Sequence, residues 1–148
     1  MKALASAGGG FLLAVLWFDL MFDVQARGYA SDVPEAALAS IAAYYARVTT
    51  AARPMNRLVA VAMALTIAAV IAELAKGVSS AWAAWASLAA VLCAVALVAA
   101  RTVPNAVRLG TRSDSHETQS ALATAILCDH VLCAGAIILL LALQVLVS

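Results

Sequence analysis

Four long apolar runs divide the chain, and short clusters of charged residues, proline or glycine separate them. The runs cover residues about 5–22, 58–74, 81–100 and 121–147. Each is close to the length of about 20 residues that a helix needs to cross the hydrocarbon core of a bilayer. Backbone polar groups in lipid must be satisfied internally, so such runs fold as helices. The pattern predicts an all-α fold, an integral membrane four-helix bundle that forms one membrane domain over residues 1–148.

A shorter, alanine-rich stretch at about residues 34–50 lies between the first two spans. Asp32 and Glu35 flank Pro34 at its start and have the spacing of a capping box. The stretch is too short to span a bilayer, and it carries Tyr44 and Tyr45, a residue type enriched at membrane interfaces. We expect an interfacial or cytoplasmic helix here, with both tyrosines at the level of the lipid headgroups.

The third and fourth helices are expected to extend beyond the hydrocarbon core. Pro104 predicts a bend after the third span, and Gly110 is placed as the C-cap of its extension. Asp114 and Glu117 have capping-box spacing at the start of the fourth helix. That helix is roughly 50 Å long at 1.5 Å per residue, so its first turns project into the same water as the end of the third.

Composition and charge support a membrane location. Hydrophobic residues make up 66% of the chain and charged residues 11%, against about a quarter charged in soluble domains. The net charge of +1 gives no reason to expect nucleic-acid binding. All seven arginines fall at one end of the spans, whereas Lys2 and Lys76 lie at the other. The positive-inside rule then predicts a multi-pass protein of a bacterial-type inner membrane, with both termini on the non-cytoplasmic side and a long cytoplasmic connection between spans 1 and 2.

Ionisable and amide side chains gather at the arginine-rich end of all four spans. They are Asp19 and Asp23 in the first span, Arg53 and Asn56 at the second, Arg101 and Asn105 at the third, and Asp129 and His130 in the fourth. Charged side chains inside a span are costly in lipid and usually face a bundle interior or a wet cavity. We therefore expect a polar pocket at the cytoplasmic end, with the other half of the bundle as a dry scaffold.

One hypothesis for this pocket is an enzyme, such as an oxidoreductase, that acts on a lipophilic substrate. Histidine titrates near neutral pH and carboxyl groups can be tuned by burial, so these groups suit general acid–base catalysis. The candidate catalytic residues are Asp129, His130, Asp19 and Asp23. The candidate substrate-binding residues, which could stabilise a developing oxyanion, are Arg53, Asn56, Arg101 and Asn105.

A metal site is a second hypothesis and overlaps the first. Its ligands would be Asp19, Asp23, Asp129 and His130. Three carboxylates with one imidazole suit iron, manganese or zinc, so one divalent metal is the cofactor that the pattern suggests. Adjacent residues on a helix point about 100° apart, however, which argues against Asp129 and His130 facing the same ion.

The alternative hypothesis is a non-enzymatic membrane assembly or interaction subunit. Its polar residues would form structural interhelical pairs, for example Asp19 and Asp23 with Arg53 and Arg101. Small residues such as Gly8-Gly9-Gly10 let helices approach closely and favour a homo-oligomer. The hypotheses differ in one respect. An enzyme needs Asp129 or His130 to face a cavity, whereas in an assembly subunit both side chains are paired with residues of neighbouring helices.

Three features resemble the anthrone-oxygenase-like family of small membrane proteins. They are four spans in about 150 residues, a polar motif that closes the first span, and the Arg101-x-x-Pro104-Asn105 motif after the third. Members with an assigned function oxidise polycyclic anthrones to quinones, so the resemblance implies a lipophilic, aromatic substrate. The stretch from Pro34 to Thr50 and the Asp129-His130 pair depart from that family's pattern.

Overall fold

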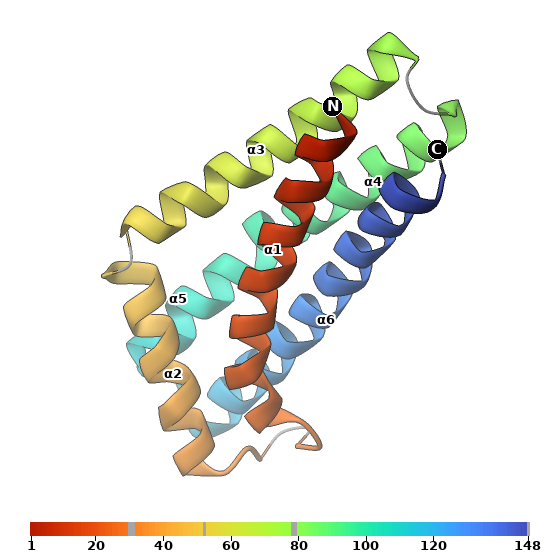
Figure 1. Ribbon diagram of the computed structural model, residues 1–148. Helices are drawn as coiled ribbons and strands as arrows, with labels where there is room; N and C mark the ends of the chain where they lie inside the picture. The colour runs from red at the N-terminus through yellow and green to blue at the C-terminus, as the bar shows by residue number, and fades with distance from the viewer. Residues whose placement is uncertain (30–31, 52, 78–79, 148) are drawn as a thin grey trace.

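The chain folds into a bundle of helices, shown in Figure 1. The computed structural model describes residues 1–29, 32–51, 53–77 and 80–147, apart from the side chains of residues 53 and 54. Within these ranges the elements are α1 (Lys2–Asp23), η1 (Val24–Ala26), α2 (Glu35–Thr50), α3 (Arg53–Lys76), α4 (Ala81–Leu97), η2 (Val98–Thr102), α5 (Val103–Thr111) and α6 (His116–Leu146). The described part contains no strand, which confirms the all-α prediction.

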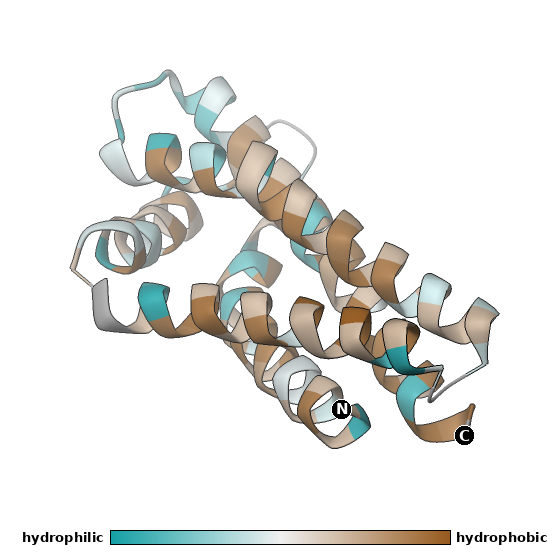
Figure 2. Cartoon of the chain, turned by 90° about the horizontal axis from the view of Figure 1, so that it is seen from above, coloured by the Kyte–Doolittle hydropathy of each residue, from teal (hydrophilic) through white to brown (hydrophobic). Residues whose placement is uncertain are grey.

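Over the same ranges, four helical segments are long and apolar enough to cross a membrane. They are Lys2–Ala26, Met55–Lys76, Ala81–Thr111 and His116–Leu146. Both termini lie at one end of the bundle (Figure 1), where the Lys2 Nζ donates a hydrogen bond of 3.1 Å to the Val147 carbonyl oxygen. Brown, hydrophobic residues predominate along these helices in Figure 2. The predicted four-span membrane bundle is confirmed.

α2 covers the arginine-rich end of the bundle, packed against α5 and the start of α6 (Figure 1). Its buried residues Leu38, Ile41, Ala42 and Tyr45 recur every three or four positions and form one apolar stripe. This stripe packs into a core cluster with Leu109 of α5 and Ile126 of α6. Tyr45 therefore points into the bundle and Tyr44 packs partly against the same cluster, so the two rings contact protein as well as lying at the level that the sequence suggests.

Two helix starts differ from the expected capping boxes. Pro34 is the N-cap residue of α2, and no side chain caps that helix. The N-cap of α6 is Ser115, whose hydroxyl accepts a hydrogen bond from the Thr118 backbone N–H. Asp114 pairs instead with Arg108, at 2.8 Å. Arg108 thus binds the Asp114 carboxylate, and Ser115, one position later, caps α6 instead.

The end of α5 also differs from the prediction, because Arg112, not Gly110, has the left-handed conformation that ends the helix (φ 55°). Gly110 is helical and lies against the backbone of α2. A Cβ at this position would be 2.9 Å from the Ala46 backbone nitrogen, well inside contact distance. The glycine is therefore needed for a close approach of two helices, which a pattern of helix-ending residues does not reveal.

A π-helical turn, η2, joins α4 to α5 and ends two residues before Pro104. Proline has no N–H to donate to the preceding turn, and π turns inside α-helices are frequent at functional sites. Here the π turn carries Arg101 and Thr102, which both reach Asp129 on α6. The irregularity expected at Pro104 thus lies just upstream and orients two polar side chains.

The half of the bundle near the termini is not the dry scaffold that the sequence suggests. Four polar side chains there are buried: Thr66, Glu73, Ser87 and Gln144. Gln144 Nε2 lies 3.4 Å from the Ser87 hydroxyl. Hydropathy averaged over a span does not reveal single polar residues, so the sequence indicates a polar cluster only at the arginine-rich end.

Candidate functional site

The centre of the polar cluster is a buried pair between α1 and α6. The Asp23 carboxyl and the His130 imidazole are 0% and 5% exposed. Asp23 Oδ2 lies 2.6 Å from His130 Nδ1, and Oδ1 accepts a 2.6 Å hydrogen bond from the Tyr45 hydroxyl of α2. One carboxyl group therefore joins three helices that are distant in sequence.

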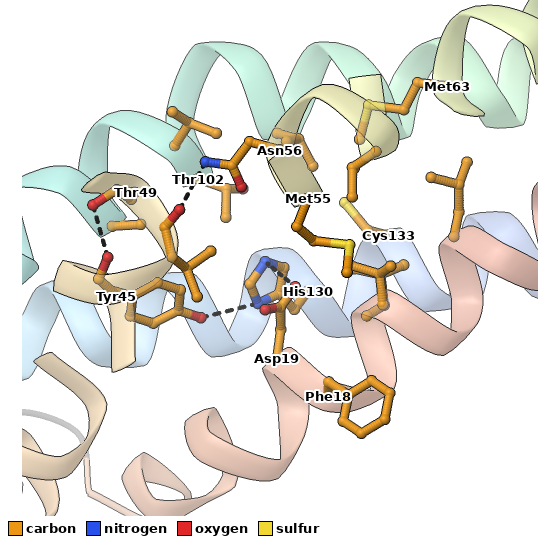
Figure 3. Close-up of a pocket in the computed structure, with 18 of the residues that line it drawn as sticks. Phe18, Asp19, Tyr45, Thr49, Met55, Asn56, Met63, Thr102, His130 and Cys133 are labelled. Atoms are coloured by element: carbon orange, nitrogen blue, oxygen red, sulfur yellow. Dashed lines mark hydrogen bonds and ion pairs between the residues drawn. The ribbon is translucent and has the colours of Figure 1, made fainter. Parts of the chain in front are cut away.

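Asp19 lies one helical turn before Asp23 and continues the same network. Its Oδ1 accepts a 2.6 Å hydrogen bond from the Tyr44 hydroxyl, while its Oδ2 lies 3.9 Å from His130 Nε2. The Tyr44 ring stacks on Phe22 with ring centroids 4.1 Å apart. Figure 3 shows Asp19, Tyr45 and His130 converging from α1, α2 and α6. The imidazole is thus placed between two carboxyl groups, each of which receives a tyrosine hydroxyl.

The two tyrosines belong to α2, which is not one of the spanning segments. Burial raises the pKa of each hydroxyl far above its usual value, and the neighbouring Asp19 and Asp23 carboxylates raise it further. Tyr44 and Tyr45 therefore stay protonated at physiological pH and act as hydrogen-bond donors. They neutralise no charge, but they satisfy carboxylate oxygens that would otherwise be buried without partners.

Asp129 forms a separate cluster, although it is adjacent to His130 in the sequence. Its side chain is 0% exposed, and Oδ2 lies 3.2 Å from Arg101 Nε and 3.3 Å from the Thr102 hydroxyl. Its other oxygen, Oδ1, has no hydrogen-bond partner in the described part of the chain. Neighbouring positions on a helix face different directions, so Asp129 faces η2 whereas His130 faces α1 and α2.

A half-open cavity of about 650 Å³ lies beside the Asp19–His130 cluster, between α1, α3, α6 and the helices of the arginine-rich end. Most of its lining is apolar. The polar lining residues are Asp19, Tyr44, Tyr45, Thr49, Asn56, Thr102 and His130. Figure 3 shows several of these side chains around the space, together with Met55, Met63 and Cys133. The cavity therefore has a polar part at the cluster and an apolar remainder.

The residues expected to be catalytic are only partly brought together. Asp19 and His130 line the cavity, Asp23 is fully buried beside His130, and Asp129 is outside the lining. Of those expected to bind a substrate, Asn56 lines the cavity and its Nδ2 donates to the Val48 carbonyl oxygen at 2.7 Å. Arg101 and Asn105 lie outside the lining, and the side chain of Arg53 is outside the described residues.

The four expected metal ligands fall into the two clusters. Asp129 is committed to Arg101 and Thr102, while Asp19 and Asp23 bond to the tyrosines and His130. In the ranges that the structure describes, no group of three His, Cys, Asp or Glu side chains is arranged to hold a metal ion. The geometry thus gives a metal no set of converging ligands.

Three residues of the site were not recognised in the sequence: Tyr44, Tyr45 and Thr102. The tyrosines resemble interface residues by type, and only the apolar stripe of α2, which includes Tyr45, indicates that this helix packs on the bundle. Thr102 lies between Arg101 and Pro104, and its residue type alone gives no reason to single it out. Its position depends on the π turn that ends just before Pro104.

Comparison with known proteins places this chain in a family. The family model SHR3_chaperone, described as ER membrane protein SH3, matches residues 4–147. No curated protein and no solved structure matches the chain.

The family match corrects two predictions. The resemblance to the anthrone-oxygenase-like family is wrong, because the model of a different family spans nearly the whole chain. Four spans, a polar motif that closes the first span and one Pro-Asn motif therefore do not suffice to identify the family. The bacterial-type inner membrane is also wrong, because the family is described as an ER membrane protein. Hydropathy and arginine bias indicate spans and their orientation, but they do not identify the organelle.

Proposed function

The chain belongs to the SHR3 chaperone family, and from this premise we propose that it is a non-enzymatic membrane chaperone that assists the assembly of other membrane proteins. The observation that carries the proposal is the match of the family model over residues 4–147. The oxidoreductase hypothesis receives no support from this match. Within the membrane, such a chaperone would cover apolar or incompletely packed surfaces of a client until the client's own helices associate.

The pairing of the ionisable residues supports a structural role for the polar cluster. An assembly subunit requires Asp129 and His130 to be paired, and Asp129 contacts Arg101 while His130 contacts Asp23. His130 touches the cavity but is only 5% exposed. The pairs tie α1, α2, η2 and α6 together, so the cluster fixes the shape of the bundle.

The outer faces of the helices supply surface for a client. On α1, Trp17, Phe18 and Met21 are 67%, 61% and 57% exposed, and in a bilayer they face lipid or another helix. Helices in lipid associate through close packing and interhelical hydrogen bonds. A client span could therefore replace lipid along this face without unfolding the chaperone, whose core lies on the opposite side of α1.

Depletion of the protein from its host cell tests the proposal. A panel of epitope-tagged polytopic membrane proteins is solubilised in mild detergent and separated by native electrophoresis. We expect a subset to shift from discrete species to aggregates, and re-expression of the wild type to restore them. A double Trp17→Ser, Met21→Ser variant would restore them less well, whereas the exposed control Glu117→Gln would act like the wild type. If no membrane protein changes its state on depletion, the chaperone proposal fails.

A further inference from the structure

We propose that the cavity between α1, α3 and α6 binds a single-chain lipophilic amine, with the protonated amine at Asp19 and the alkyl chain directed toward Leu12 and Ile137. This goes beyond the chaperone function and does not depend on it. Four features of the cavity lead to this ligand: its size, the separation of its polar and apolar ends, its charge, and its opening.

The size of the cavity suits a small amphiphile. Its volume of about 650 Å³ lies within the usual range for small-molecule sites, about 300–1,000 Å³.

The polar and apolar ends of the cavity lie at separate positions along α1 and α6. On α1, Asp19 and Leu12 both line the space, and on α6, so do His130 and Ile137. Seven residues separate the members of each pair, which is about 10 Å along a helix. Both helices thus run from a polar position to an apolar one in the same direction, toward the end of the bundle that carries the termini. This arrangement fits a molecule with one polar head and one alkyl chain.

The charges of the cluster favour a cationic head. Asp19 and Asp23 are two carboxyl groups around one imidazole, and the third buried carboxyl nearby, Asp129, already has Arg101. Among the described residues that line the cavity there is no lysine or arginine. His130 lies 2.6 Å from Asp23 but 3.9 Å from Asp19. Asp19, the carboxyl group farther from the imidazole, is the one that lines the cavity, and a protonated amine would place a positive charge beside it.

The cavity also has an opening that a lipid-like molecule can use. Phe18 and Met55 line it from α1 and α3, and both are more than half exposed. Val103 and Val107 of α5 line it as well, and each is 47% exposed. Because these apolar side chains belong to spanning segments, an amphiphile could enter from the bilayer without crossing a polar surface.

Photolabelling in neutral phosphatidylcholine liposomes tests this inference. Three probes of equal length are compared: dodecylamine, dodecanol and dodecanoate, each with a diazirine near the end of the chain. We expect the amine to label the protein on the order of tenfold more strongly than the carboxylate, since a charge-assisted hydrogen bond of about 1.5 kcal/mol corresponds to that factor. Mass spectrometry should locate the label near Leu12, Met63 or Ile137.

Two variants with matched controls separate binding from general membrane partitioning. Asp19→Asn keeps an acceptor for Tyr44 but removes the charge, so amine labelling should fall to the level of dodecanol; Glu117→Gln, exposed at the start of α6, should leave it unchanged. Ala60→Phe adds bulk to the cavity wall and should lower labelling by all three probes. Ala68→Phe, exposed on α3 outside the lining, should not.

Equal labelling by the three probes, or label found only on the outer faces of the helices, would overturn the inference. So would a preference for the amine that persists in Asp19→Asn. If Asp19→Asn does not fold, as judged by gel filtration, unchanged amine labelling in Ala60→Phe would overturn it equally. None of these results bears on client assembly, so the inference can fail while the chaperone function stands.

Discussion

Asp23 and His130, 107 positions apart in the sequence, form a buried contact of 2.6 Å that joins the end of α1 to the middle of α6. The Tyr45 hydroxyl bonds to the other oxygen of the same carboxyl. Because all three groups are buried among apolar helices, each depends on the others for its hydrogen bonds. The Tyr45 hydrogen bond thus adds a polar contact between α2 and the pair, beside the apolar packing of α2 on α5 and α6.

Asp23→Asn and His130→Gln should each lower the free energy of unfolding by about 3–5 kcal/mol, because each leaves a buried partner unsatisfied. The double variant should lose clearly less than the sum, since neither charge then remains. Unfolding by SDS in mixed micelles, followed by circular dichroism, measures both effects. Arg108→Gln, which breaks an exposed pair with Asp114, should change stability much less. Additive losses in the double variant would show that the two residues are not coupled.

Arg101→Gln should destabilise the bundle by about 1–2 kcal/mol, less than a fully buried pair because the Arg101 side chain is 54% exposed. The loss arises from the Asp129 carboxylate, which is left buried without a cation. Adding Asp129→Asn to this variant should restore part of the stability. Arg57→Gln, at an exposed position of α3, is the matched control. If Asp129→Asn deepens the loss instead, the Arg101 contact does not stabilise Asp129.

Tyrosine absorbance should reveal the burial of Tyr44 and Tyr45. The pKa of both hydroxyls is raised in the folded protein, so ionisation in the unfolded chain near pH 10 favours unfolding. The two protonated hydroxyls therefore contribute to the free energy of unfolding below about pH 10, and this contribution is lost as the pH rises further. The absorbance change at 295 nm in folded protein should fall short of the three-tyrosine change of the denatured chain. A full change near pH 10, with helicity retained, would contradict the buried position of the pair.

Gly110→Ala should destabilise the protein by about 1–3 kcal/mol, in the range of overpacked cores. The new methyl group would lie 2.9 Å from the Ala46 backbone nitrogen, and backbone cannot move aside as a flexible side chain can. Gly10→Ala is the control, because a Cβ there meets nothing within 4 Å, and helix propensity should stabilise it by up to about 1 kcal/mol. Thermal unfolding in detergent distinguishes the two. Equal effects of the two substitutions would mean that α5 and α2 are not in close contact.

The sequence is sufficient to predict the membrane spans and to identify the end of the bundle where ionisable groups gather. Apolar runs of the right length leave little choice but helices in lipid, and the depth of a residue follows from its position in the run. The sequence places Asp19, Asp23 and His130 at one level, and in the structure His130 lies 3.9 Å from Asp19 and 2.6 Å from Asp23.

Rotation about a helix axis and contacts with a connecting helix could not be predicted in the same way. Whether Asp129 faces the same partner as His130 depends on roughly 100° of rotation. Arg101 and Thr102 reach Asp129 from a π turn, whereas the sequence suggests only a bend at Pro104. Tyr44 and Tyr45 are expected at headgroup level because α2 alone is too short to span. Only the fold shows that α2 packs on the bundle, where its two tyrosine hydroxyls bond to Asp19 and Asp23.

The most direct test of the chaperone proposal is reconstitution. Polytopic membrane proteins that aggregate on depletion are synthesised in a cell-free system with liposomes that contain this protein, or an equal amount of an unrelated four-span protein. The fraction of each client that elutes as a monodisperse species in gel filtration is then measured. We predict a larger fraction with this protein than with the unrelated one, and no added substrate or cofactor should be required. Equal fractions in the two preparations would contradict a chaperone function.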